Sequence, residues 1–259
     1  MMNFEISNLP ERTVKPRSYG VNMIMDKGLS IREAENMIQA AGHLIDFVKL
    51  GFGTSLITGG LDEKIKFYQK EGIRLYFGGT LFEAFVIRKD IDGYKRVLDK
   101  YKMDTVEISD GSMDMDHDLK CSYINEFSKN FTVLSEVGSK RVDVILSDEQ
   151  WVQEMITEHQ AGSSFVIAEA RETGNIGIYD KTGAAKNSLI HLITKNSDVN
   201  KILWEAPQKN QQLYFINEFG PNVNLGNIAP VDVIPLETIR IGLRGDTFFN
   251  FLPDNLKQS

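Results

Sequence analysis

Short buried strands alternate with helices along most of this chain, and this alternation limits the folds that it can adopt. Eight strand-like runs are rich in Val, Ile, Leu and Phe, which is typical of parallel strands covered on both faces. These runs occupy residues 19–26, 44–49, 74–77, 104–108, 131–136, 164–169, 201–205 and 222–225. Each repeat of roughly 20–35 residues has the size of a βα unit.

Helical patterns fill the intervals between these strands. They cover residues 30–42, 61–71, 91–101, 117–130, 147–162, 185–195, 208–219 and 235–243. Ser30 with Glu33, and Ser147 with Gln150, have the spacing of a capping box at a helix start. We therefore predict an α/β protein with one (β/α)8 TIM barrel domain at 19–259, preceded by an arm at 1–18. A doubly wound open sheet is the alternative, but no GxGxxG motif follows the first strand.

The composition narrows the classes of partner. The net charge is −7, and no run is rich in Lys and Arg, which argues against nucleic-acid binding. No apolar run is long enough to span a membrane. Cys121 is the single cysteine, which excludes an internal disulfide and favours a cytoplasmic protein. The aromatic residues Phe248, Phe249 and Phe251 would pack against the barrel or a second subunit, and we expect a homo-oligomer.

Charged or amide side chains stand at the end of almost every strand. Four consecutive strands carry a glutamate there, namely Glu107, Glu136, Glu169 and Glu205. The C-terminal ends of all the strands in a parallel barrel lie at the same face, so we expect these carboxylates to converge there. One such carboxylate would suggest a loop cap or an ion pair. Four clustered carboxylates repel each other unless cations compensate them, which favours an active site over a structural ion-pair network.

The mixture of side chains at this face indicates a hard cation such as Mg²⁺, because it has several carboxylates and no histidine. Basic residues that suit a small polyanion lie near the same rim: Lys49, Lys140, Arg171, Lys209 and Arg244.

A phosphate group is expected near the last two strands, which is its usual place in such barrels. Gly226 would let the backbone approach it, with Asn227 beside it, and Arg244 would bind it in bidentate fashion. For Arg244, a solvated or ion-paired helix face is an equal alternative. Gln208 and Lys209, at a helix start behind Pro207, would lie beside the pocket.

Eight motifs give the chain a resemblance to a known family. In order, from about Tyr19 to Thr247, they are DFVKLGFGTS, GGTLFE, VEISDGS, LSEVG, EARETG, WEAPQKNQQ, VNLGNI and ETIRIGLRGDT. Together they resemble the phosphosulfolactate synthase family. The resemblance implies a (β/α)8 barrel and Mg²⁺-dependent addition of sulfite to phosphoenolpyruvate, giving (2R)-3-phosphosulfolactate. In methanogens this product feeds coenzyme M synthesis.

The resemblance also implies roles for single residues. Lys140 matches the position of the proton donor, and Lys49 and Arg171 would hold sulfite or the substrate carboxylate. The expected metal ligands are Glu107, Glu136 and Glu169, with Glu205 as a fourth ligand or as a group behind the ligands. Two alternatives remain open: a related enolate-type enzyme with another nucleophile, and a non-catalytic, stress-associated member of the family.

Overall fold

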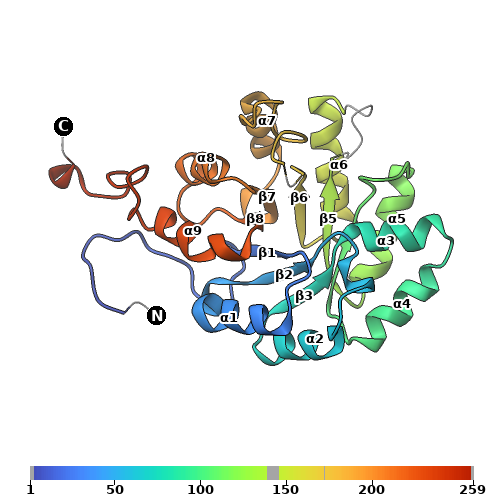
Figure 1. The fold of residues 1–259 in the computed structure, drawn as a ribbon. Coiled ribbons are helices and arrows are strands. Elements are labelled where there is room, and N and C mark those ends of the chain that lie inside the picture. The colour runs from blue at the N-terminus through green and yellow to red at the C-terminus, as the bar shows by residue number, and fades with distance from the viewer. Residues whose placement is uncertain (1–2, 139–145, 172, 258–259) are drawn as a thin grey trace.

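The strands of the protein form one closed parallel sheet. The computed structural model describes residues 3–138, 146–171 and 173–257. Within these residues the strands pair in the order β3-β2-β1-β8-β7-β6-β5-β4, and contacts between β3 and β4 close the barrel (Figure 1). This is the (β/α)8 barrel that the sequence predicts. The strands are β1 (Asn22–Asp26), β2 (Phe47–Leu50), β3 (Arg74–Phe77), β4 (Thr105–Ile108), β5 (Thr132–Val137), β6 (Phe165–Ala168), β7 (Ile202–Glu205) and β8 (Leu225–Ile228).

Helices connect successive strands and cover the outside of the barrel (Figure 1). Within the described residues they are α1 (Ile31–Ala41), α2 (Leu61–Lys70), α3 (Gly79–Ile87), α4 (Ile91–Lys100), α5 (His117–Ser128), α6 (Asp148–Ala161), α7 (Asn187–Asn196), α8 (Lys209–Phe219) and α9 (Val233–Arg240). None of these helices is both long and apolar enough to cross a membrane. Both predicted capping boxes are confirmed, at Ser30 and at Ser147.

Two elements differ from the sequence prediction. Helix α3 was not predicted, because it follows Gly78 without a side-chain cap and its apolar residues leave no polar face to give a helical period. Strand β8 begins at Leu225, whereas the prediction for this strand was 222–225. Before β8, the side chains of Asn222 and Asn224 accept hydrogen bonds from the backbone N–H groups of Thr13 and Gly20.

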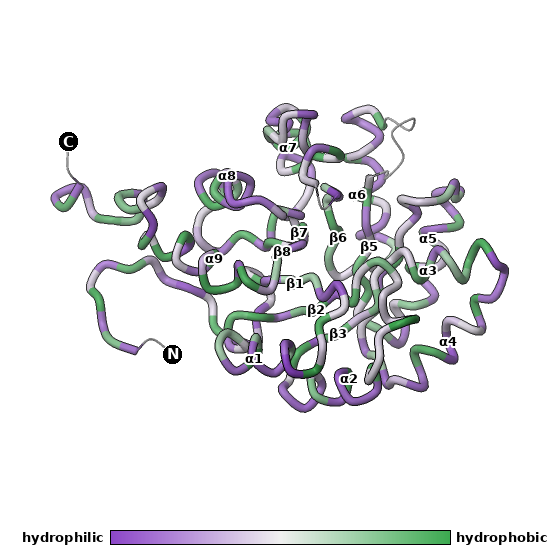
Figure 2. The backbone as a smooth tube through the Cα atoms, in the orientation of Figure 1, coloured by the Kyte–Doolittle hydropathy of each residue, from purple (hydrophilic) through white to green (hydrophobic). Residues whose placement is uncertain are grey.

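The apolar character of the strands reflects burial on both of their faces. One set of side chains fills the barrel and the other packs under the helices, so the strand tubes are mostly white or green in Figure 2. The set inside the barrel is Val21, Met23, Phe47, Tyr76, Leu134, Phe165, Ile167 and Leu203. We call the open end of the barrel, where the strands end, the C-terminal mouth. The apolar side chains inside the barrel lie directly beneath it.

Buried polar side chains hold the opposite, N-terminal end of the barrel. Asn224 Oδ1 accepts hydrogen bonds from the N–H groups of Gly20 at 2.7 Å and Val21 at 3.2 Å. Its Nδ2 donates to the carbonyls of Asn200 at 3.0 Å and Ile202 at 2.9 Å. One amide thus joins the starts of β1, β7 and β8.

Arginines reinforce the same end. Arg240 is fully buried and donates to the Pro221 carbonyl at 2.7 Å and to Asn22 Oδ1 at 2.8 Å. Arg17, in the segment before β1, lies 3.1 Å from Asp46. These contacts give Arg240 a structural role, away from the C-terminal mouth.

Removing the Asn224 amide should weaken the whole fold. Asn224→Ala leaves two buried donors, one buried acceptor and one part-buried acceptor without this partner, so we expect a loss of about 3 kcal/mol in the free energy of unfolding. Urea unfolding of both proteins measures it. Asn196→Ala is the control, because this exposed amide donates only within its own helix, and it should change stability by less than about 0.5 kcal/mol. Equal effects of the two substitutions would contradict the role of Asn224.

Candidate active site

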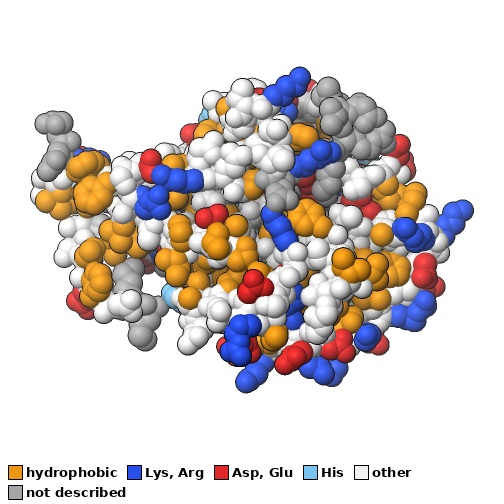
Figure 3. Space-filling model, viewed as in Figure 1, with side chains coloured by type: hydrophobic (Ala, Val, Ile, Leu, Met, Phe, Trp, Pro, Cys, Tyr) orange, Lys and Arg blue, Asp and Glu red, His pale blue; other side chains and the backbone are white. Residues whose placement is uncertain are grey.

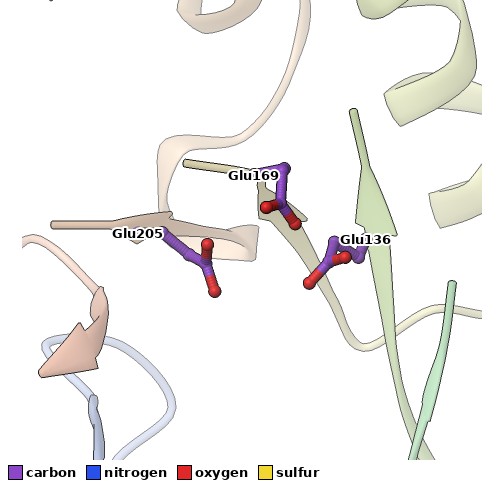
Figure 4. Close-up of side chains that lie close together, drawn as sticks. All are labelled: Glu136, Glu169 and Glu205. Carbon is purple, nitrogen blue, oxygen red and sulfur yellow. The ribbon is translucent and has the colours of Figure 1, made fainter. Parts of the chain in front are cut away.

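Three carboxylates converge at the C-terminal mouth of the barrel. Glu136 lies in β5, Glu169 directly follows β6 and Glu205 ends β7. One carboxylate oxygen from each lies within 4.8 Å of the others, and all three side chains are buried. Figure 4 shows them pointing toward a common point from three separate strands. This oxygen-only group could hold a metal ion, and its donors suit a hard cation.

Lys49 compensates these carboxylates from the other side of the barrel. Its Nζ, at the end of β2, lies 2.9 Å from Glu107, 3.3 Å from Glu136 and 3.9 Å from Glu205. Burial alone would lower the pKa of Lys49, but these three carboxylates outweigh it and hold the pKa well above its usual value. Lys49 is therefore a fixed positive charge at neutral pH.

Glu107 stands apart from the three-carboxylate group and bridges the seam between β3 and β4. Its Oε1 accepts the backbone N–H of Gly79 at 2.6 Å, and its Oε2 lies 2.9 Å from Lys49. Gly79 opens α3, directly behind β3, whereas Glu107 belongs to β4. A Cβ at position 79 would lie 2.7 Å from Glu107 Oε1 and would also collide with Ser109. The seam thus requires a glycine beside this glutamate.

Buried polar side chains of α3 and α5 fix the loop that follows β4. Glu83 accepts the Ser109 hydroxyl and the Ser112 N–H, the latter at 2.8 Å. Lys120 lies 2.8 Å from Asp110 and donates to the backbone carbonyl of Glu136 at 2.7 Å. Asp110 therefore has a structural partner behind the mouth, while Ser112 reaches the cavity.

A cavity of about 410 Å³ opens above the carboxylates. Arg171, from the segment after β6, lines it together with the three glutamates and Lys49, so Glu169 and Arg171 both face the cavity although both lie beyond the end of the strand. The remaining lining residues are Met25, Phe52, Thr80, Ser112, Thr173 and Asn227. Apolar side chains from β1 and the β2 loop thus face acidic ones from β5 to β7. Met25 and Phe52 were not predicted as site residues, because in the sequence they resemble ordinary core and turn residues.

Asn227 has an unusual conformation in this wall. Its φ is 56°, inside β8, where the register between β1 and β8 shifts. The side chain is 5% exposed, lines the cavity and has no hydrogen-bond partner among the described residues. Asn224, by contrast, uses both ends of its amide within the protein. A buried amide held in a left-handed conformation and facing a cavity is suited to a ligand.

The other predicted residues lie elsewhere. Gln208 donates its side-chain amide to the Thr173 carbonyl at 2.7 Å, and Lys209 pairs with Asp246 at 2.5 Å on the surface. Arg244 is half-buried near Asp246, and Gly226 lies in β8 where a Cβ would approach the core residues Met23 and Leu203. None of these four is among the described residues that line the cavity. Lys140 lies outside the described residues.

Comparison with known proteins identifies similar sequences over most of the chain. Residues 10–246 match the family described as (2R)-phospho-3-sulfolactate synthase (ComA). The phosphosulfolactate synthase of Bacillus subtilis (strain 168) is 42% identical over 251 residues, covering 96% of this chain and 100% of that protein. That of Methanocaldococcus jannaschii is 42% identical over 235 residues, covering 88% of this chain and 94% of that protein.

Solved structures with a similar fold are distant in sequence. 3-Hexulose-6-phosphate synthase from Salmonella typhimurium has a TM-score of 0.54 and 12% identity, covering 83% of this chain and 90% of that one. Thiamine phosphate pyrophosphorylase from Pyrococcus furiosus has a TM-score of 0.51 and 8% identity, covering 93% of this chain and 98% of that one. These similarities support the barrel fold alone.

Removing the charge of Lys49 should destabilise the mouth in a pH-dependent way. Lys49→Met removes the ammonium group that contacts three buried carboxylates, so we expect a loss of about 3–5 kcal/mol in the free energy of unfolding at pH 8. In the variant, mutual repulsion raises the carboxylate pKa values in the folded state above their unfolded values. The folded state then binds more protons, so the loss should shrink as the pH falls from 8 to 5.5.

Urea unfolding of both proteins at the two pH values measures this change. Lys95→Met serves as the control, because Lys95 pairs with Glu126 at 2.6 Å with both side chains largely exposed. It should cost less than about 1 kcal/mol at either pH. A Lys49→Met loss that does not vary with pH would contradict the proposed compensation.

Proposed function

The chain belongs to the (2R)-phospho-3-sulfolactate synthase family, and we propose on this basis that it adds sulfite to phosphoenolpyruvate to form (2R)-3-phosphosulfolactate. The observation that carries the proposal is the mouth of the barrel, where three buried carboxylates and the charged Lys49 line one cavity with Arg171. Such a cavity can bind a small polyanion through a cation and basic side chains. The chain would act as a carbon–sulfur lyase operating in the direction of bond formation.

The donor set supports magnesium as the bound cation. Glu136, Glu169 and Glu205 offer carboxylate oxygens alone, which are the donors that a hard divalent cation prefers. When bound, the cation would act as a Lewis acid toward the substrate carboxylate. Glu107 has both oxygens engaged by Gly79 and Lys49, so we propose that it orients Lys49 rather than binding the metal.

The cavity residues suggest how the organic substrate and sulfite are held. In the reaction, the sulfur of sulfite bonds to the methylene carbon of phosphoenolpyruvate, and C2 gains one proton. We propose that Arg171 and Lys49 provide positive charge for the anionic groups and that the Asn227 amide donates to a substrate oxygen. Lys140 remains our proposed proton donor on the basis of the family resemblance.

The cavity gives less support to the phosphate site that was predicted around Gln208, Lys209, Gly226 and Arg244. Their positions, given above, put none of them in the described cavity wall. Binding by Lys209 or Arg244 would require the Lys209–Asp246 pair to open. We therefore propose that the phosphate binds nearer to Arg171 and Asn227.

The cellular setting remains a proposal. A single half-buried cysteine suits the cytoplasm. We propose a homo-oligomer, and exposed apolar side chains, including Leu56, Ile57, Val231 and Phe248, support it. Figure 3 shows hydrophobic side chains on the surface of the molecule.

Product analysis tests the reaction. The purified protein, incubated with sulfite, phosphoenolpyruvate and Mg²⁺, should form phosphosulfolactate, detected by mass spectrometry. Lys49→Met should reduce the rate at least a hundredfold, because both substrates are anionic and the carboxylates lose their compensating charge. Turnover with another nucleophile but not with sulfite would favour the enolate-type alternative. A folded, metal-binding protein without turnover would favour the non-catalytic one.

Calorimetry tests the metal ligands without depending on activity. Glu205→Gln should raise the Kd for Mg²⁺ at least tenfold, because a charged ligand is lost. Glu107→Gln should raise it less, since Glu107 acts through Lys49. The control is Glu71→Gln, which changes an exposed glutamate at the C-terminal end of α2 and should leave the Kd unchanged. Equal increases for Glu107→Gln and Glu205→Gln would place Glu107 among the ligands.

A further inference from the structure

The segment that carries Arg171 to the cavity forms a tight turn after β6. The Gly174 N–H donates to the Arg171 carbonyl at 2.8 Å, and the Arg171 N–H donates to Glu169 Oε1 at 3.0 Å. Arg171 and Thr173 both line the cavity. The turn lies beyond the last residue of the strand, Ala168, so the sheet ladder does not hold it. Other contacts must set its position.

Two glutamines at the start of α8 hold the outer side of this turn. Gln208 Nε2 donates to the Thr173 carbonyl at 2.7 Å, and Gln211 Nε2 donates to the carbonyls of Gly174 at 2.7 Å and Gly183 at 3.3 Å. Gln211 Oε1 accepts the Gln208 N–H at 3.2 Å, which completes a capping box. We call this pair the glutamine clasp.

The clasp fits the turn closely. Gln211 is 1% exposed, so water cannot take over its hydrogen bonds. Gly174 has a φ of 63°, and a Cβ there would lie 2.5 Å from Gln211 Nε2. The turn and the Gln211 amide are therefore in close contact, and a side chain at position 174 would displace the amide.

The same segment also forms hydrogen bonds with Glu205, one of the candidate metal ligands. The Ala170 N–H donates to Glu205 Oε2 at 3.0 Å, and Tyr179 Oη donates to the Glu205 carbonyl at 2.7 Å. The segment is thus linked to β7 at Glu205 and to α8 at the clasp. These two links fix the position of the segment that carries Arg171 relative to Glu205.

We propose that Gln208 and Gln211 are positioning residues for substrate binding, which hold Arg171 at the cavity wall without touching the substrate. This inference rests on the proposed function and deepens it by assigning anion recognition to a segment that α8 holds in place. A guanidinium pre-placed beside the cavity loses less conformational entropy on binding an anion. Loosening the clasp should therefore weaken substrate binding more than it slows the chemical step.

The chain offers a matched control one residue away. Gln212 is also a buried glutamine of α8, 2% exposed, but its Nε2 donates to the Ala206 carbonyl at 3.2 Å and does not reach the turn. Gln211→Ala and Gln212→Ala remove the same atoms from the same helix. A general loss of α8 packing would affect both variants, whereas loss of the clasp would affect only the first.

Steady-state kinetics and hydrogen exchange test the proposal on the full chain. With saturating sulfite and Mg²⁺, Gln211→Ala should raise KM for phosphoenolpyruvate roughly tenfold and change kcat by less than about threefold. Gln208→Ala should raise KM in the same direction but less, because Gln208 is exposed and makes one of the contacts. Amide exchange should accelerate at residues 173–186 in both variants, and Gln212→Ala should leave KM and this exchange unchanged.

The outcomes separate this inference from the proposed function. If Gln211→Ala and Gln212→Ala raise KM equally, or if Gln211→Ala speeds exchange at 173–186 without raising KM, the positioning role is wrong. If the wild-type protein binds phosphoenolpyruvate in calorimetry but makes no phosphosulfolactate, the proposed reaction fails. The clasp is then judged by the phosphoenolpyruvate Kd of the same variants, which should follow the order expected for KM. Should Gln211→Ala not fold, Gln208→Ala decides the question alone.

Discussion

The mouth of the barrel depends on the contact of one ammonium group with several carboxylates. Lys49 reaches from β2 to Glu107 in β4, Glu136 in β5 and Glu205 in β7, so a single charge links β2 to three strands with which it does not pair. Without it, the clustered carboxylates would repel one another in a site where burial makes such repulsion strong. Because a single ammonium group offsets only part of the negative charge of the carboxylates, the group can still attract a cation. Stability and chemistry therefore depend on the same contacts.

The acidic layer rests directly on an apolar one. Beneath the carboxylates the barrel is filled by side chains such as Met23, Tyr76 and Leu203, and no described residue of this inner set is charged. Water is excluded from below, so ligands and charges meet only from the open side. Electrostatic interactions at such a site are stronger than in water and need little reorganisation when a ligand binds. A parallel barrel supplies this arrangement because all its strands end at one face.

The sequence was sufficient for the barrel and for the convergence of Glu136, Glu169 and Glu205, since strand period and topology determine both. It failed where the answer depends on contacts between distant segments. The seam role of Glu107 depends on Gly79, 28 residues away, and the amide of Gln208 meets Thr173, 35 residues away. Helix α3 was missed because apolar residues occupy almost all of its positions, so the polar period that marks a helix is absent. The left-handed backbone of Asn227 is likewise set by the β1–β8 register shift.

Three helices share one way of supporting the cavity. Glu83 of α3, Lys120 of α5 and Gln211 of α8 all lie in the first two turns of their helices, and each is buried. Each binds the backbone of a strand end or of the loop behind it: at Ser112, at Glu136 and at Gly174. The cavity walls are therefore fixed from outside by groups that do not line the cavity. Met25 and Phe52, which do line the cavity, take no part in these supporting contacts, so the residues that shape the cavity surface are distinct from those that fix its walls.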